Sequence, residues 1–209
     1  HADAAAEMAR TETDPRVRAN LERMAAVNAR LVSEPPADFV EACQWIGWYQ
    51  MAARMYNGSG SLGRLDMLLE PYFDRDRAAG RIDDEEAILH LACIFLMETG
   101  YIQIGGPDES GREVTSRITY LVLEAARRLN VPVNLGVAVG QDVPDELIRK
   151  AVEVQFANKN GVPKFLGVDN TSREFARNGY PIELGRARAY AGCHWLGIPG
   201  REYTLNDCC

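Results

Sequence analysis

Hydrophobic residues recur along most of the chain at the three-to-four-residue spacing of an α-helix, with charged residues between them. This pattern predicts helices over residues 3–31 (with a break at Asp14-Pro15), 39–55, 62–70, 83–101, 113–129, 144–157 and 171–178. Apolar runs at 131–139 and 164–168 predict buried strands, and the glycine-rich segment 185–200 predicts a loop. Helices that alternate with short buried strands are typical of an α/β layered fold with its strands inside.

Three local signals refine this pattern. Asp38 follows Pro35-Pro36 and is placed to cap the helix that begins at Phe39. That helix is apolar around most of its circumference, which indicates burial on more than one side. The segment from Leu62 is expected to leave the helical conformation near Glu70, because a residue before proline avoids helical backbone angles.

Composition changes the picture mainly by exclusion. Asp and Glu number 30 against 23 for Lys and Arg, giving a formal charge of −7, so a nucleic-acid partner is not expected. No apolar run approaches the ~20 residues that cross a bilayer, and the first residues lack the basic and apolar regions of a signal peptide. We therefore expect a cytoplasmic protein without a membrane partner. The missing initiator Met suggests that the chain does not begin where a gene begins.

Five cysteines are present, at positions 43, 93, 193, 208 and 209, without a repeated Cys-x-x-Cys spacing. Neither a metal site nor a disulfide scaffold is predicted from them. Cys193, in Ala191-Gly-Cys-His-Trp, is the most informative candidate. From the residues alone it is read first as a small buried side chain, and otherwise as a nucleophile beside His194 or as a metal ligand.

Two further candidates have structural interpretations. Arg64 and Asp66, in Ser61-Leu-Gly-Arg-Leu-Asp, suit either an anion site or an ion pair within a helix or from helix to loop, and the ion pair is favoured. His90 lies in an apolar helix and is read as a core histidine.

Taken in order, nine segments resemble the central part of a glycyl radical enzyme of the pyruvate formate-lyase type. These segments are Thr13–Arg16, Phe39–Met55, Ser61–Asp66, Glu70–Asp76, Asp84–Ile88, Gly105–Asp108, Thr119–Ala125, Gly161–Phe165 and Gly192-Cys193. The resemblance implies a ten-stranded barrel of two half-sheets wrapped by helices, with the part seen here mostly helical. Residues 1–209 would be a partial domain of this type, inactive alone, without its N-terminal part and its C-terminal glycine radical domain.

The same resemblance implies a function for Cys193. In that family the cysteine on a central loop becomes a thiyl radical, which removes hydrogen from a small organic substrate and starts C–C, C–O or C–N cleavage. A glycyl radical on a C-terminal segment generates it, and a separate S-adenosylmethionine iron–sulfur activating enzyme installs that glycyl radical, so no bound cofactor is expected. Gly192 and Gly197 would allow a tight loop around the sulfur. His194 and Trp195 are expected to line the substrate pocket, and the complete enzyme is expected to be a homodimer.

The segment departs from the commonest pattern of that family at Trp195. Many relatives carry a glutamate base at this place, two residues after the cysteine, and an indole cannot replace a carboxylate base. A dehydratase of the familiar kind is therefore disfavoured, and an aromatic or apolar substrate is favoured. The alternatives are a radical addition enzyme like benzylsuccinate synthase, a non-catalytic homologue that binds other subunits, and a helical protein whose cysteine is structural.

Overall fold

The computed structural model describes residues 1–56, 61–97, 100–192 and 196–202. Within these ranges the elements, in chain order, are α1 (Ala2–Thr11), α2 (Pro15–Arg30), α3 (Phe39–Tyr56), β1 (Ser61–Arg64), α4 (Leu65–Ala78), α5 (Asp84–Met97), β2 (Tyr101–Ile104), α6 (Arg117–Leu129), β3 (Leu135–Val139), α7 (Asp145–Asn158), β4 (Lys164–Gly167), α8 (Val168–Arg177), α9 (Ile182–Ala187), β5 (Ala189–Tyr190) and β6 (Leu196–Gly197). No helix in the described ranges is long and apolar enough to cross a membrane.

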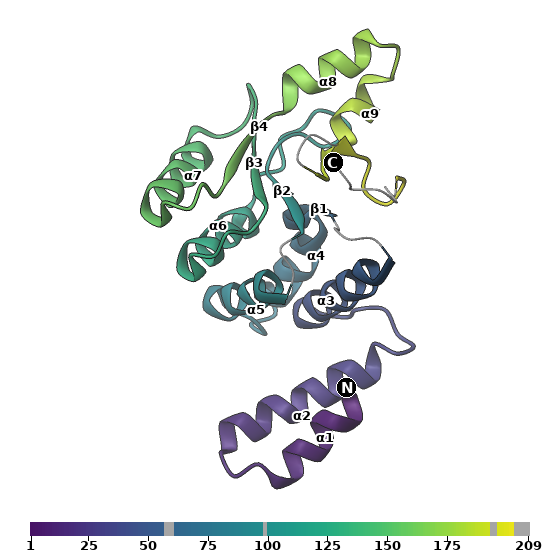
Figure 1. Cartoon of the computed structure of the whole chain (residues 1–209), viewed down its shortest axis with the longest axis vertical. Coiled ribbons are helices and arrows are strands. Elements are labelled where there is room, and N and C mark those ends of the chain that lie inside the picture. The colour runs from purple at the N-terminus through teal and green to yellow at the C-terminus, as the bar shows by residue number, and fades with distance from the viewer. Residues whose placement is uncertain (57–60, 98–99, 193–195, 203–209) are drawn as a thin grey trace.

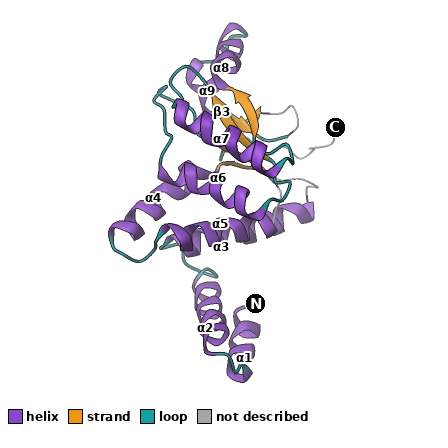
Figure 2. Ribbon diagram, turned by 90° about the vertical axis from the view of Figure 1, so that its left-hand side faces the viewer, coloured by secondary structure: helices purple, strands orange, loops and turns teal. Residues whose placement is uncertain are grey.

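A parallel sheet with the strand order β1-β2-β3-β4 forms the centre of the fold. Each connection between neighbouring strands contains helix, as parallel pairing requires. Helices α7, α6, α5 and α3 pack side by side in that order, and α4 packs against α3, α6 and strands β1 and β2 (Figures 1 and 2). The small antiparallel hairpin β5–β6 also packs on the sheet.

Side-chain alternation on β2 shows how the two faces differ. Ile102 and Ile104 are fully buried and belong to the hydrophobic core under the helices. Gln103, between them, faces the hairpin and is 2% exposed. The sheet therefore has an apolar face toward the helices and a face that holds polar contacts to the hairpin.

The helical pair α1–α2 projects from the rest of the molecule at the N-terminal end (Figure 1). The break expected at Asp14-Pro15 is confirmed, and Asp14 caps α2, because its carboxylate accepts from the backbone N–H groups of Arg16 and Val17. The Trp48 indole donates to the Asn28 side chain at 2.5 Å and so joins α2 to α3.

Several predicted boundaries are wrong. The structure has strand β1 at Ser61–Arg64, where a helix was expected from Leu62. Helix α5 ends at Met97 and Tyr101 begins strand β2, so the helix predicted to Tyr101 was too long. Strand β3 begins at Leu135 rather than residue 131, α6 begins at Arg117 rather than residue 113, and helix α9 covers part of the expected glycine-rich loop.

Helix α4 continues through Pro71, which contradicts the expected end near Glu70. An interior proline costs a helix about 3 kcal/mol. Leu65, Leu69 and Phe73 recur at four-residue spacing and are fully buried. Each such side chain contributes roughly 1.5–3 kcal/mol by its burial, which offsets the proline.

An ion-pair network joins three of the helices on the outer face. Glu124 of α6 accepts from Arg127 at 2.6 Å and from Arg128 at 2.9 Å, and lies 3.8 Å from Lys150 of α7. Arg128 also binds Glu85 of α5. Hydrogen bonds from Arg127, followed by those from Arg128 and the nearby positive charges, lower the pKa of Glu124 to about 2.

Replacing Glu124 with glutamine is expected to lower the free energy of unfolding of the complete protein by about 1 kcal/mol near neutral pH. Because the pKa is lower in the folded state, this contribution is present above the unfolded pKa and is lost as pH falls through about 2. Denaturant unfolding at several pH values measures it. Glu7→Gln is the control, since Glu7 and its partner Arg10 are exposed on α1. A difference that stays constant as the pH falls would contradict the network's role.

Candidate functional site

The hairpin β5–β6 brackets the segment that the sequence singles out. Ala189 pairs with Gly197 and Tyr190 pairs with Leu196. Residues 191–195 join the two strands, and Cys193, His194 and Trp195 lie outside the described residues. The structure therefore defines what holds the two ends of this segment, and the roles of those three residues stay predictions.

Three strands of the parallel sheet hold Tyr190, three residues before Cys193. The backbone N–H of Tyr190 donates to the Gln103 amide oxygen at 3.1 Å. The Ser61 hydroxyl donates to the Tyr190 carbonyl oxygen at 2.9 Å, and Lys164 donates to the Tyr190 hydroxyl at 2.9 Å. Tyr190 is 4% exposed, so these bonds are shielded from water and fix the entry to the loop.

The outgoing strand β6 is held from the other side. Arg188 donates to the Leu196 carbonyl oxygen and to Glu202, each at 3.0 Å. Glu202 in turn accepts from the Ile198 backbone N–H at 3.0 Å. The Arg188 guanidinium also lies 4.3 Å from the ring centre of Phe175 on α8. Both ends of the loop are therefore held by side chains from other elements.

Contrary to the expectation, the backbone at position 197 does not require glycine. Gly197 is paired in β6, its backbone lies outside the left-handed region, and an added Cβ would lie 3.7 Å from that of Ala191, an ordinary contact. Gly63 has the stricter requirement: its φ is +61°, and a Cβ there would come within 2.9 Å of Pro199. Close approach of β1 to the segment after β6 therefore depends on Gly63.

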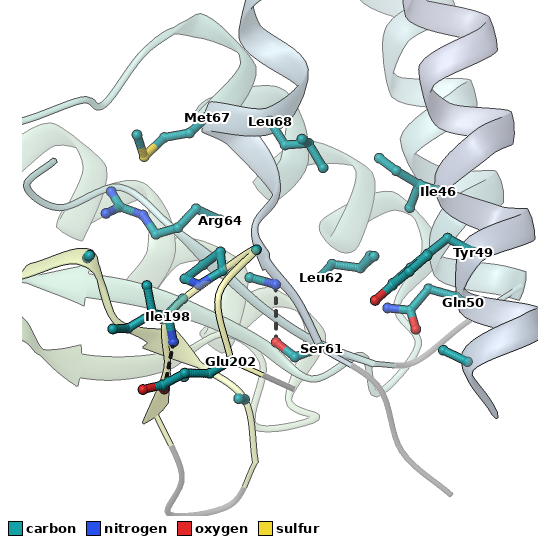
Figure 3. A pocket seen from close by; sticks show the side chains of 18 of the residues that line it. Ile46, Tyr49, Gln50, Ser61, Leu62, Arg64, Met67, Leu68, Ile198 and Glu202 are labelled. Atoms are coloured by element: carbon teal, nitrogen blue, oxygen red, sulfur yellow. Dashed lines mark hydrogen bonds between the residues drawn. The ribbon is translucent and has the colours of Figure 1, made fainter. Parts of the chain in front are cut away.

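Two cavities flank the hairpin. The larger, of about 670 Å³, is lined by one face of α3, by β1, by the start of α4 and by residues of the hairpin and after it (Figure 3). The smaller, of about 260 Å³, lies on the side of β4, α8 and α9. Ala189 and Ala191 line the larger cavity, whereas Tyr190 and Leu196 line the smaller one. The two cavities therefore lie on opposite sides of the hairpin.

Among the described contacts, Arg64 and Asp66 do not form the ion pair that was expected between them. Both side chains instead bind the loop after β2. The Arg64 guanidinium donates to the carbonyl oxygens of Gly105 at 2.8 Å, Gly106 at 3.0 Å and Pro107 at 2.6 Å. Burial lowers the pKa of Arg64. This side chain therefore fastens the loop at the rim of the larger cavity.

The Asp66 carboxylate completes that attachment. It accepts from the Gly105 backbone N–H at 2.7 Å, the Thr119 hydroxyl at 2.8 Å and the Met67 backbone N–H at 2.9 Å. Burial raises the pKa of Asp66, and these bonds oppose the rise. The expected ion pair is therefore wrong, because both side chains bind neutral groups, chiefly the backbone of the loop after β2.

The other predicted candidate, His90, is a partly buried helix residue. Burial lowers its pKa, and Glu86 lies 3.7 Å away. No cluster of three or more potential metal ligands occurs among the described residues.

Sequence reasoning missed four residues that shape the site: Gln50, Gln103, Lys164 and Tyr190. Gln103 is a polar residue between two isoleucines, which is the alternation of a half-apolar strand, but it was assigned to no element. Gln50 is a polar residue inside an otherwise apolar helix. No local signal marks Lys164 or Tyr190, because their contact joins residues 26 positions apart.

Comparison with known proteins gives a family match over the whole chain. A family model described as pyruvate formate lyase-like matches residues 1–209. The isethionate sulfite-lyase of Desulfovibrio desulfuricans is 29% identical over 231 residues, covering 98% of this chain and 28% of that protein. The 4-hydroxyphenylacetate decarboxylase glycyl radical subunit of Clostridium scatologenes is 24% identical, covering 89% of this chain and 24% of that protein.

Solved structures show the same fold. A glycyl radical enzyme from Archaeoglobus fulgidus has a TM-score of 0.87 and 25% identity, covering 98% of this chain and 29% of that one. The B12-independent glycerol dehydratase from Clostridium butyricum, in its glycerol-bound form, has a TM-score of 0.87 and 24% identity, covering 95% of this chain and 28% of that one. The expected fold, part of a glycyl radical enzyme barrel wrapped by helices, is confirmed. The chain spans under a third of the length of these relatives.

Proposed function

The chain belongs to the pyruvate formate lyase-like family of glycyl radical enzymes, and from this premise we propose that it is the part of such an enzyme that carries the hydrogen-abstracting cysteine, Cys193. In this proposal, Cys193 removes a hydrogen atom from a small organic substrate and thereby starts cleavage of a C–C, C–O or C–N bond. Residues 1–209 are then a partial domain, and its N-terminal part and its glycine radical domain are other segments of the complete protein.

The observation that carries the proposal is the arrangement around the hairpin β5–β6. The buried Gln103 of β2 binds Tyr190 at one end of the segment that contains Cys193, Arg188 binds Leu196 at the other end, and a cavity lies on either side of the hairpin. Hydrogen transfer requires the sulfur and the substrate carbon to be in contact, so a hairpin with anchored strands beside open space suits it. Enclosure by the sheet and helices also limits access of water to a radical.

The useful form of Cys193 is the neutral thiol. S–H bonds and activated C–H bonds are similar in strength, so hydrogen transfer between them is nearly balanced. A glycyl radical, installed by an S-adenosylmethionine iron–sulfur activating enzyme on a segment outside this chain, supplies the oxidation of the thiol. Depression of the thiol pKa, which activates nucleophilic cysteines, is not required here.

His194 and Trp195 are proposed to line the substrate site. The indole at position 195 supplies no carboxylate base, which favours an aromatic or apolar substrate and keeps radical addition, as in benzylsuccinate synthase, as the second candidate. We further propose a cytoplasmic homodimer, with the activating enzyme as its protein partner.

Anaerobic activation of the complete protein by its activating enzyme, followed by electron paramagnetic resonance, tests the proposal. The expected result is the doublet signal of a glycyl radical, formed only when S-adenosylmethionine is supplied. A fully active preparation without any glycyl doublet would refute the assignment. A sample without S-adenosylmethionine is the control, because it contains the same proteins and reductant.

A further inference from the structure

Gln50 is a buried polar side chain without a partner in the part of the chain that the structure describes. It lies on α3 and is 0% exposed, yet neither its amide nitrogen Nε2 nor its amide oxygen Oε1 makes a hydrogen bond. Buried amides are nearly always hydrogen-bonded, so an unpaired one requires an explanation. Gln50 lines the larger cavity beside the hairpin (Figure 3). A ligand in this cavity would explain the unpaired amide.

The surroundings of Gln50 have the character of a small-molecule site. Trp45, Ile46 and Tyr49 line the cavity from the same helix as Gln50. Ile46 and Tyr49 lie beside Gln50 on α3, and Leu62 of β1 lies across from them (Figure 3). Trp45 and Tyr49 are each 48% exposed, so the helix presents aromatic surface to the cavity. Apolar walls with a few placed polar groups are what ligand sites usually offer.

Most of the charged groups at this cavity already have partners, and the Arg64 Nε is an exception. Arg64 is the cation of the described lining, and its terminal nitrogens are bound to three backbone carbonyl oxygens. The acidic groups of the lining also have partners: Asp108 pairs with Arg112, Glu202 with Arg188 and Glu109 with Arg201. A buried anion needs a charged or strongly donating partner. Among the described lining residues the Arg64 Nε is a charged donor without a partner, whereas Gln50 is neutral, so the character of the group bound at Gln50 follows from its own amide, which has both a donor and an acceptor.

We propose that Gln50 is a specificity-determining residue, which binds an uncharged group of the substrate that both donates and accepts a hydrogen bond, such as an alcohol hydroxyl. The amide Nε2 donates to this group and Oε1 accepts from it, so both orphaned atoms become satisfied. A carboxylate could only accept and would leave Oε1 unpaired. This inference rests on the proposed function, because the ligand is the molecule from which Cys193 removes hydrogen.

The test uses the complete protein without activation, so that it is independent of the radical. Glycerol is the hydroxyl probe and acetate the anionic probe, with binding measured by ligand-observed NMR and Tm by thermal unfolding. Gln50→Leu keeps the shape and removes both hydrogen-bonding atoms. It is expected to weaken glycerol binding roughly 10-fold or more. Since an unpaired buried amide is lost, its Tm should be unchanged or higher than that of the wild type.

The matched control is Gln141→Leu, which makes the same chemical change on an exposed loop outside the cavity. It should alter neither glycerol binding nor Tm. A structural role for Gln50 would show the reverse pattern, with a lower Tm for Gln50→Leu and unchanged glycerol binding, and would overturn the proposal. So would a wild-type protein that fails to bind glycerol or binds acetate more tightly. A missing glycyl doublet would refute the radical function instead, so the two failures are distinguishable.

Discussion

Replacing Cys193 with alanine in the complete, activated enzyme is expected to abolish turnover while the glycyl radical signal remains. Alanine has no S–H bond, and its C–H bonds are too strong to take part in a nearly balanced hydrogen transfer. We expect the rate of substrate consumption to fall roughly 10⁴-fold or more. Product formation and electron paramagnetic resonance are measured on the same sample, which separates loss of chemistry from failure of activation.

Cys93→Ala is the matched control for this experiment. Cys93 lies on α5, is exposed and makes no part of either cavity beside the hairpin. It should keep full activity. Cys43 is a less suitable control, because it is buried in the core and its replacement would leave a hole there. Turnover at the wild-type rate by Cys193→Ala would contradict the proposed role of this residue.

The parallel sheet explains how strand β5, which leads to Cys193, is held. Ser61, Gln103 and Lys164 come from three different strands and all bind Tyr190. Residues on rigid strands position a site more precisely than residues on neighbouring loops. The strands thus act on the loop through Tyr190, whereas Arg188 and Glu202 act on its other end.

The sequence predicted the long helices and the β4 strand well, because their signals are local. The α3 and α7 patterns each extend over several turns, and the structure has both helices within two residues of the expected bounds. Strand β4 is short, but its apolar run is flanked by turn signals, and the structure has it at Lys164–Gly167.

Strands β1 and β2 could not be predicted, because each is only four residues long and overlaps a segment with a helical hydrophobic pattern. Strand β1 overlaps the start of the expected helix 62–70, and β2 begins at the last residue of the expected helix 83–101. Their conformation depends on pairing with strands that are distant in the sequence. Strand β2 pairs with β1 on one side and with β3 on the other. The helix end predicted before Pro71 was wrong for a related reason. Burial of Leu69 and Phe73 outweighs the local preference of a residue before proline for non-helical angles.

The candidate site divides in the same way. Cys193 was predicted from its neighbours in the sequence, Ala191-Gly-Cys-His-Trp, and from the family resemblance. Gln50, Gln103 and Lys164 gain their importance from contacts or cavities formed only after folding, and no short motif contains them. Arg64 and Asp66 were noticed as a pair, but their common partner is a loop about 40 residues away, which only the fold reveals.

Replacing Asp66 with alanine is expected to cause the largest loss of stability among changes near the site. Asp66 is 1% exposed and accepts hydrogen bonds from Gly105, Thr119 and Met67. Its removal leaves buried donors unpaired, which should lower the free energy of unfolding of the complete protein by about 3 kcal/mol. Denaturant unfolding followed by tryptophan fluorescence is a suitable measurement, because Trp45 and Trp48 lie on the neighbouring helix α3.

Asp66→Asn separates hydrogen bonding from charge in this position. The amide oxygen, in the place of Oδ2, can still accept from both the Gly105 N–H and the Thr119 hydroxyl, whereas the amide nitrogen, in the place of Oδ1, cannot accept from the Met67 N–H. Because burial raises the pKa of Asp66, the site itself favours a neutral group, and asparagine should cost only about 1 kcal/mol. Asp142→Ala, on an exposed loop, should have no effect. Equal losses for Asp66→Ala and Asp66→Asn would mean that the negative charge, and not the set of hydrogen bonds to the loop, is what stabilises this end of β1.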